Sequence, residues 1–122
     1  MSSPGWFAAI ACAVLFIVVN TAIWGVVSMA VDGVGRNHLA GIRLPSLMRS
    51  DEAWKTGHLA ARKVMRPLLV AAVVIALVSI PVQLVPVLYI VVLGLSLGCT
   101  LAALGFGAFA ASRAARRLTP VH

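Results

Sequence analysis

The sequence has little charge. Only 11% of its 122 residues are charged and just three are acidic, whereas 61% are hydrophobic. Soluble domains are about 25% charged and about 45–50% apolar, so this composition excludes an ordinary soluble domain. The three acids all lie between residues 32 and 52, and no nucleophile is spaced to pair with a base. The sequence therefore offers no catalytic group of residues, and we expect no enzyme activity.

Cysteine is also scarce. Cys12 and Cys99 stand alone in apolar runs, without Cys-x-x-Cys or Cys/His spacing, which argues against a metal site built on them. His58 has only His38 as a nearby second ligand, too few for a zinc site. We expect no metal and no cofactor.

Three apolar runs, residues 6–31, 67–82 and 86–111, approach or exceed the roughly 20 residues that cross a bilayer. They predict an all-α integral membrane protein, a single membrane domain over residues 1–122 with three transmembrane helices. Ser28–Ala30 resembles a signal-peptide cleavage site, but no basic residue precedes the run and its apolar part is too long, which favours a retained helix.

Prolines mark the ends of the second run. Pro81 and Pro86 resist helix continuation and predict a tight hairpin of the second and third helices, with Gln83 at the outer interface. Pro67 either starts a new helix or kinks a continuous one, and the sequence does not choose between them.

Basic residues lie in two segments only. Seven of the ten fall between the first and second runs, and three follow the third. The positive-inside rule places both segments in the cytoplasm, so loop 32–66 and tail 112–122 are predicted inside and the N-terminus outside. The net charge of +7 then serves orientation and anionic lipid headgroups; we expect no nucleic-acid partner.

The predicted spans contain a few polar or small residues that point to helix packing. Asn20 needs a hydrogen-bond partner in hydrocarbon, and we expect Ser96 or Thr100 rather than a transport role. Gly94, Gly98 and Ala102 recur every four residues and so share a face that allows close approach of another helix. Packing within the hairpin is favoured over dimerisation.

The loop has its own pattern. Ser50 can cap a helix that starts at Asp51 and runs to about Lys63. One face of this helix is apolar and the other is basic; the apolar face carries Trp54, Gly57, His58, Ala61 and Met65. Such an amphipathic helix either lies in the headgroup layer or docks under the bundle.

Upstream of that helix, Gly41 and Pro45 bracket Arg43 in what reads as an ordered turn. Arg43 is a candidate to bind a lipid phosphate, a carboxylate or a group of carbonyls. Alternatively, Arg43 is only one more of the positive charges that keep this loop in the cytoplasm.

These residues carry a family resemblance. The pattern N-x-x-x-G-I-R-x-P followed by S-D-E-x-W-x-x-x-H resembles the signature of the SdpI family of small bacterial membrane proteins. It is formed here by Asn37, Gly41, Ile42, Arg43, Pro45, Ser50, Asp51, Glu52, Trp54 and His58.

The resemblance implies a location in the bacterial cytoplasmic (inner) membrane. It also implies immunity to a secreted peptide toxin, sometimes coupled to signalling by a soluble regulator held at the membrane. The alternative is a structural accessory subunit of a larger membrane complex, which the Gly-rich third run and the lack of catalytic groups suit equally well.

Overall fold

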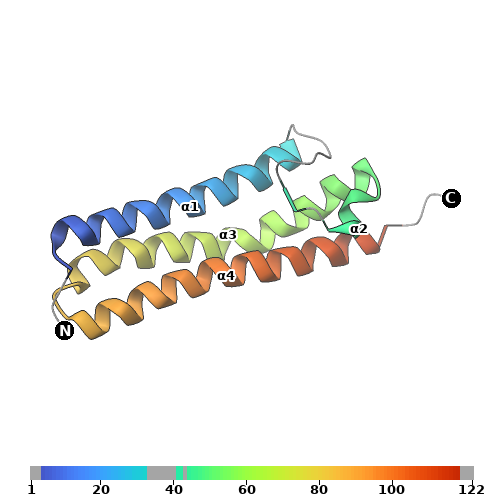
Figure 1. The fold of residues 1–122 in the computed structure, drawn as a ribbon. Helices are drawn as coiled ribbons and strands as arrows, with labels where there is room; N and C mark the ends of the chain where they lie inside the picture. The colour runs from blue at the N-terminus through green and yellow to red at the C-terminus, as the bar shows by residue number, and fades with distance from the viewer. Residues whose placement is uncertain (1–3, 33–40, 43, 119–122) are drawn as a thin grey trace.

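Three long helices lie side by side in the computed structural model, which describes residues 4–32, 41–42 and 44–118. They are α1 (Trp6–Asp32), α3 (Asp51–Val82) and α4 (Pro86–Arg116), and the short helix α2 (Pro45–Met48) packs at one end (Figure 1). All three long helices are apolar and long enough to cross a membrane. The predicted fold class is confirmed.

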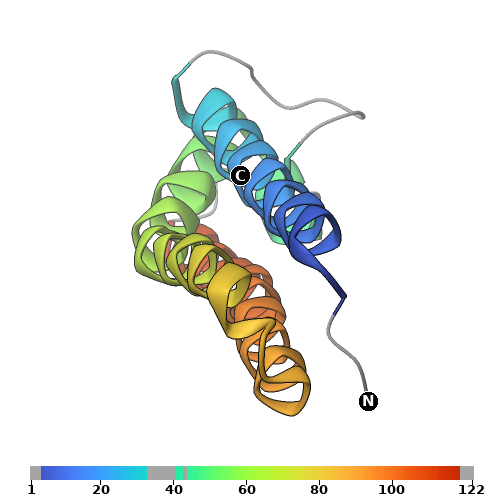
Figure 2. The ribbon, with the colours of Figure 1, turned by 90° about the vertical axis from the view of Figure 1, so that its left-hand side faces the viewer.

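The helix α3 is central. It packs against α1, α2 and α4, and Figure 2 shows α1, α3 and α4 at the corners of a triangle. We call the two ends of this bundle the α2 end and the turn end, where α3 is joined to α4. Many large apolar side chains point outward, among them Phe7, Leu15 and Phe106, as expected where lipid replaces water around the helices.

The helix α3 runs unbroken through both prolines, since Pro67 and Pro81 lie inside it. The predicted amphipathic helix is therefore the first half of α3 and continues directly into the second apolar run. Its apolar face is buried, which decides between the two alternatives in favour of docking against the bundle. The turn after Val82 is short, and Pro86 occupies the first turn of α4, where its missing N–H costs nothing.

Small residues line the contact between α3 and α4. Ala72 and Ala103 are fully buried there, and the Ser96 hydroxyl donates to the Ala72 carbonyl at 2.7 Å. A Cβ on Gly107 would lie 2.6 Å from the Met65 Cγ. The two helices approach closely because these positions carry almost no side chain.

Gly94 and Gly98 do not take part in this contact. Both are exposed, and a Cβ on either would meet nothing within 4 Å; Ala102 is half-buried. The expectation that this face packs within the hairpin is wrong. Ser96 faces α3, and a residue two positions away points about 200° around the helix, so both glycines face outward.

Polar contacts hold α1 at three points along its length. The Gly5 N–H donates to Gln83 Oε1 at 3.2 Å at the turn end. In the middle, the Thr100 hydroxyl donates to Asn20 Oδ1 at 2.8 Å, and Asn20 Nδ2 donates to the Phe16 carbonyl at 2.7 Å. The predicted partnership of Asn20 with Thr100 is confirmed. Near the α2 end, Arg62 pairs with Asp32 at 3.2 Å.

Candidate functional site

The residues of the sequence motif that the structure describes meet at the α2 end. Gly41, Pro45, Ser50, Trp54 and His58 lie in or beside α2 and the first turns of α3. Asp51 is exposed in the first turn of α3. Asn37 and Arg43 lie outside the described residues, so their predicted roles stay predictions.

His58 joins the loop to α3. It is fully buried, and its Nε2 lies 2.8 Å from the Ile42 nitrogen, which donates. Its Nδ1 lies 2.7 Å from the Trp54 carbonyl oxygen. A backbone N–H only donates and a carbonyl only accepts, so this geometry assigns a neutral ring with its proton on Nδ1. Both ring nitrogens are engaged, and His58 is not free to act as a base or a ligand.

The electrostatics of His58 agree with this assignment. It lies before the apolar part of α3, and burial lowers its pKa from the usual 6.5, although the hydrogen bond to the Trp54 carbonyl opposes this. Desolvation disfavours the charged ring. The neutral form is the one that can accept from Ile42.

Gly41 is required at its position for two reasons. Its φ of +107° is one that side chains rarely allow. A Cβ there would also lie 2.7 Å from the Trp54 ring and 2.9 Å from His58 Nε2. The Trp54 and His58 rings pack with centroids 4.2 Å apart. We call Gly41, Ile42, Trp54 and His58 the His58 clamp, because they hold the loop backbone against α3.

The helix α2 ties the same end together. Leu47 is fully buried against Gly57, where an added Cβ would meet its side chain at 2.7 Å. Arg49 donates to the Ala115 carbonyl at 2.7 Å and so joins α2 to the last turn of α4. The Ser46 and Ser112 hydroxyls lie 3.2 Å apart.

The cap on α3 was predictable, but α2 was not. The Ser50 hydroxyl accepts from the Ala53 N–H at 3.0 Å, which confirms the predicted cap. The spacing of Gly41 and Pro45 predicted a turn around Pro45; α2 and the contacts of Leu47 and Arg49 were not predicted. The available signal was Pro45 itself, since proline favours the first position of a helix.

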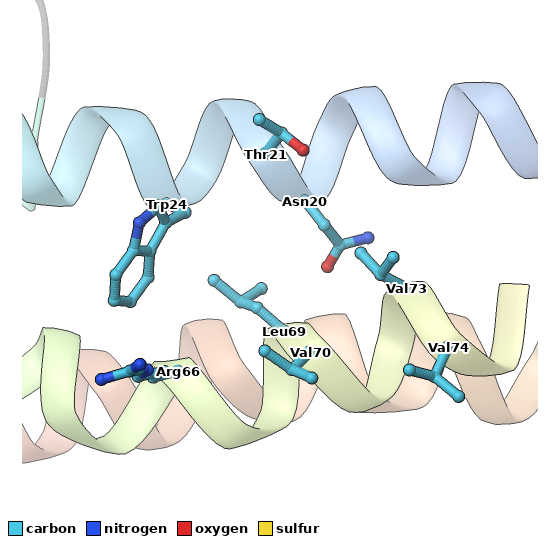
Figure 3. A pocket seen from close by; sticks show the side chains of 8 residues that line it. All are labelled: Asn20, Thr21, Trp24, Arg66, Leu69, Val70, Val73 and Val74. Carbon is cyan, nitrogen blue, oxygen red and sulfur yellow. The ribbon is translucent and has the colours of Figure 1, made fainter.

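Apolar hollows flank α1. One of about 400 Å³ lies between α1 and α3, with the Asn20 side chain directed into it and Trp24 and Arg66 toward one end (Figure 3). Another of about 280 Å³ is lined in part by Gly41, Ile42 and Met65. Their linings are mainly hydrocarbon, which suits contact with apolar groups rather than a reaction.

No three His, Cys, Asp or Glu side chains within the described ranges are placed to hold a metal ion. The contacts at the α2 end fix the position of the backbone just before and just after Arg43. Ile42 and Leu44, its two neighbours, pack against the hydrophobic core.

Comparison with known proteins adds one match. The model of the SdpI/YfhL protein family matches residues 33–106, which is more than half of the chain and includes α2, α3 and most of α4 but not α1. No curated protein and no solved structure matches the chain significantly. The described part of the motif lies at the α2 end of three helices able to span a membrane, and the chain belongs to the SdpI/YfhL family of small multi-span membrane proteins.

Proposed function

We propose that this is a non-catalytic protein of the bacterial cytoplasmic membrane. It acts in envelope or toxin immunity, or in membrane signalling, through the basic loop between α1 and α3. The observation that carries this proposal is the His58 clamp. The buried ring accepts a hydrogen bond from the Ile42 N–H and is itself held by its bond to the Trp54 carbonyl of α3. This fixes the segment that leads into Arg43, which supports a recognition surface rather than a reaction centre.

The proposed orientation puts the α2 end in the cytoplasm. Every basic side chain in the described residues lies before Pro67 in the chain or after residue 112, and α2, the start of α3 and the end of α4 meet at this end (Figure 1). The charge is thus collected at one end of the folded bundle, as the positive-inside rule requires of a cytoplasmic face.

The second candidate function is an accessory subunit of a larger membrane complex. The exposed face around Gly94 and Gly98 favours it, because open space at both positions lets another transmembrane helix approach closely. Purification in a mild detergent separates the two functions. Stoichiometric recovery of a large integral membrane protein supports the subunit, and recovery of the chain alone supports the first proposal.

The test of the first proposal uses Arg43. An arginine presents a planar fork of donors that lysine lacks, so a recognition role predicts that Arg43→Lys impairs the protein nearly as much as Arg43→Ala. The assay is survival of a deletion strain under a peptide toxin or envelope stress, with Lys55→Ala as the control and expression checked by immunoblot. Full rescue by Arg43→Lys with failure of Arg43→Ala would leave Arg43 only the role of a positive charge.

A further inference from the structure

On the outer face of α4, near its C-terminal end, an apolar hollow adjoins a basic one, and together they form a continuous stripe. One hollow of about 360 Å³ is apolar and is lined by Ala102, Gly105, Phe106 and Phe109. The next, of about 340 Å³, is lined by Phe109, Ser112, Arg113, Arg116 and Arg117. They share Phe109, and the spacing of three or four residues places the whole stripe on one face of the helix.

The level of the membrane boundary along α4 can be read from its neighbours. The apolar run of α1 ends at Asp32, which pairs with Arg62. Three residues after Arg62, Met65 contacts Gly107. Because α3 and α4 are antiparallel, the level of Arg62 falls about three residues beyond Gly107, next to Phe109. The apolar hollow therefore lies on the hydrocarbon side of the boundary and the basic hollow on the polar side.

The two hollows match the two parts of a phospholipid: the apolar hollow suits an acyl chain, and the basic hollow suits a phosphate group. Phe106 and Phe109 are both more than 60% exposed, and Gly105 beside them leaves open space where a side chain would stand. No acid lines the basic hollow, so three neighbouring guanidinium groups gather positive charge there. Guanidinium groups bind phosphate with paired hydrogen bonds.

We propose that this stripe, the Phe109 groove, binds one anionic phospholipid. Its phosphate lies among Arg113, Arg116 and Arg117, and an acyl chain occupies the hollow that Gly105, Phe106 and Phe109 line. Basic residues can orient a protein in the membrane by their charge alone. That effect would not explain why an apolar hollow adjoins the basic one across the membrane boundary. The groove selects anionic over zwitterionic lipids because it offers positive charge with no acid beside it.

The test of the basic half is native mass spectrometry of the full chain in a mild detergent, titrated with phosphatidylglycerol or with phosphatidylcholine of the same acyl chains. The first phosphatidylglycerol binds more tightly than phosphatidylcholine. Arg113→Gln/Arg117→Gln weakens it by more than about tenfold, since each basic residue near an anionic lipid contributes about fivefold. The control Lys55→Gln/Lys63→Gln removes the same charge from exposed positions on α3 and changes the affinity by less than about twofold.

The apolar half has its own matched pair. Gly105→Leu and Gly94→Leu both add a side chain in open space, so neither disturbs the bundle. Only Gly105→Leu fills the groove, and it weakens phosphatidylglycerol binding several-fold while Gly94→Leu does not. Glycerol phosphate, which has no acyl chain, competes poorly.

Four results would each overturn the proposal. They are equal affinity for the two lipids, an equal loss in the Lys55→Gln/Lys63→Gln control, and competition by glycerol phosphate as strong as that by phosphatidylglycerol. The fourth is a dimer of the unaltered chain that Gly105→Leu dissociates while lipid binding is unchanged, which would assign this face to a second copy.

Discussion

Neighbouring residues on α3 have opposite environments. Trp54 is 1% exposed in the His58 clamp, whereas Lys55 is exposed. Trp54→Ala removes a buried aromatic, and we expect it to cost about 3–5 kcal/mol and to lower the amount of folded protein. Lys55→Ala should leave both the stability and the amount of folded protein unchanged. Detergent-solubilised yield and thermal unfolding of the two variants measure this, and equal values would show that the clamp adds no stability.

His58 gives the protein a defined pH dependence. Its pKa is lowered from 6.5 in the folded state, so below pH 6.5 the unfolded chain binds the proton more readily than the folded one. The free energy of unfolding should be constant above about pH 7.5 and fall as the pH drops through 6.5. Thermal unfolding in detergent between pH 8 and 5.5 tests this.

His58→Gln is the control for that measurement. It removes the titrating ring, so the variant should be less stable at every pH and should lack the decline below pH 6.5. A decline of the same size in the variant would assign the effect to other groups.

At the scale of helices, the polar pair within the membrane holds α1 against α4. Asn20→Ala or Thr100→Val should each destabilise the bundle, and the double variant should cost less than the sum of the two. The expected coupling energy is about 0.6 kcal/mol and no more than about 1.7 kcal/mol, the range found for such pairs in bilayers. A double-mutant cycle on thermal stability measures it, and strict additivity would show that the 2.8 Å contact contributes nothing.

The sequence predicted the long helices because each carries an apolar run that matches the bilayer. The face of α4 that meets α3 was not predicted, since most of α4 is apolar and both its small-residue faces satisfy the same spacing. The available signal was Ser96 and Thr100, which lie on the buried face. The buried apolar face of α3 was predictable because charges mark the opposite side. The contact of His58 with Ile42 joins residues 16 positions apart, and no local pattern encodes it.

At the scale of the whole molecule, we predict its orientation in the membrane, with the α2 end in the cytoplasm and the turn end outside. Glu52 is exposed at the α2 end and Val85 at the turn end, so they report on opposite sides of the membrane. With Cys12 and Cys99 replaced by alanine, Val85→Cys should react with an impermeant thiol reagent on intact cells. Glu52→Cys should react only after permeabilisation. The reverse pattern would invert the orientation and place the basic end outside.

The three polar contacts of α1 together restrict two movements, sliding along its axis and rotation about it, which its apolar surface alone would not prevent. A helix surrounded by lipid can slide along its axis or rotate about it at little cost, because one apolar neighbour replaces another. A contact at each end and one in the middle oppose both movements more than once. Single substitutions should therefore leave the position of α1 intact. Displacement of α1 would appear only when two of these polar contacts are lost together, so this helix can tolerate more sequence change than its few polar contacts suggest.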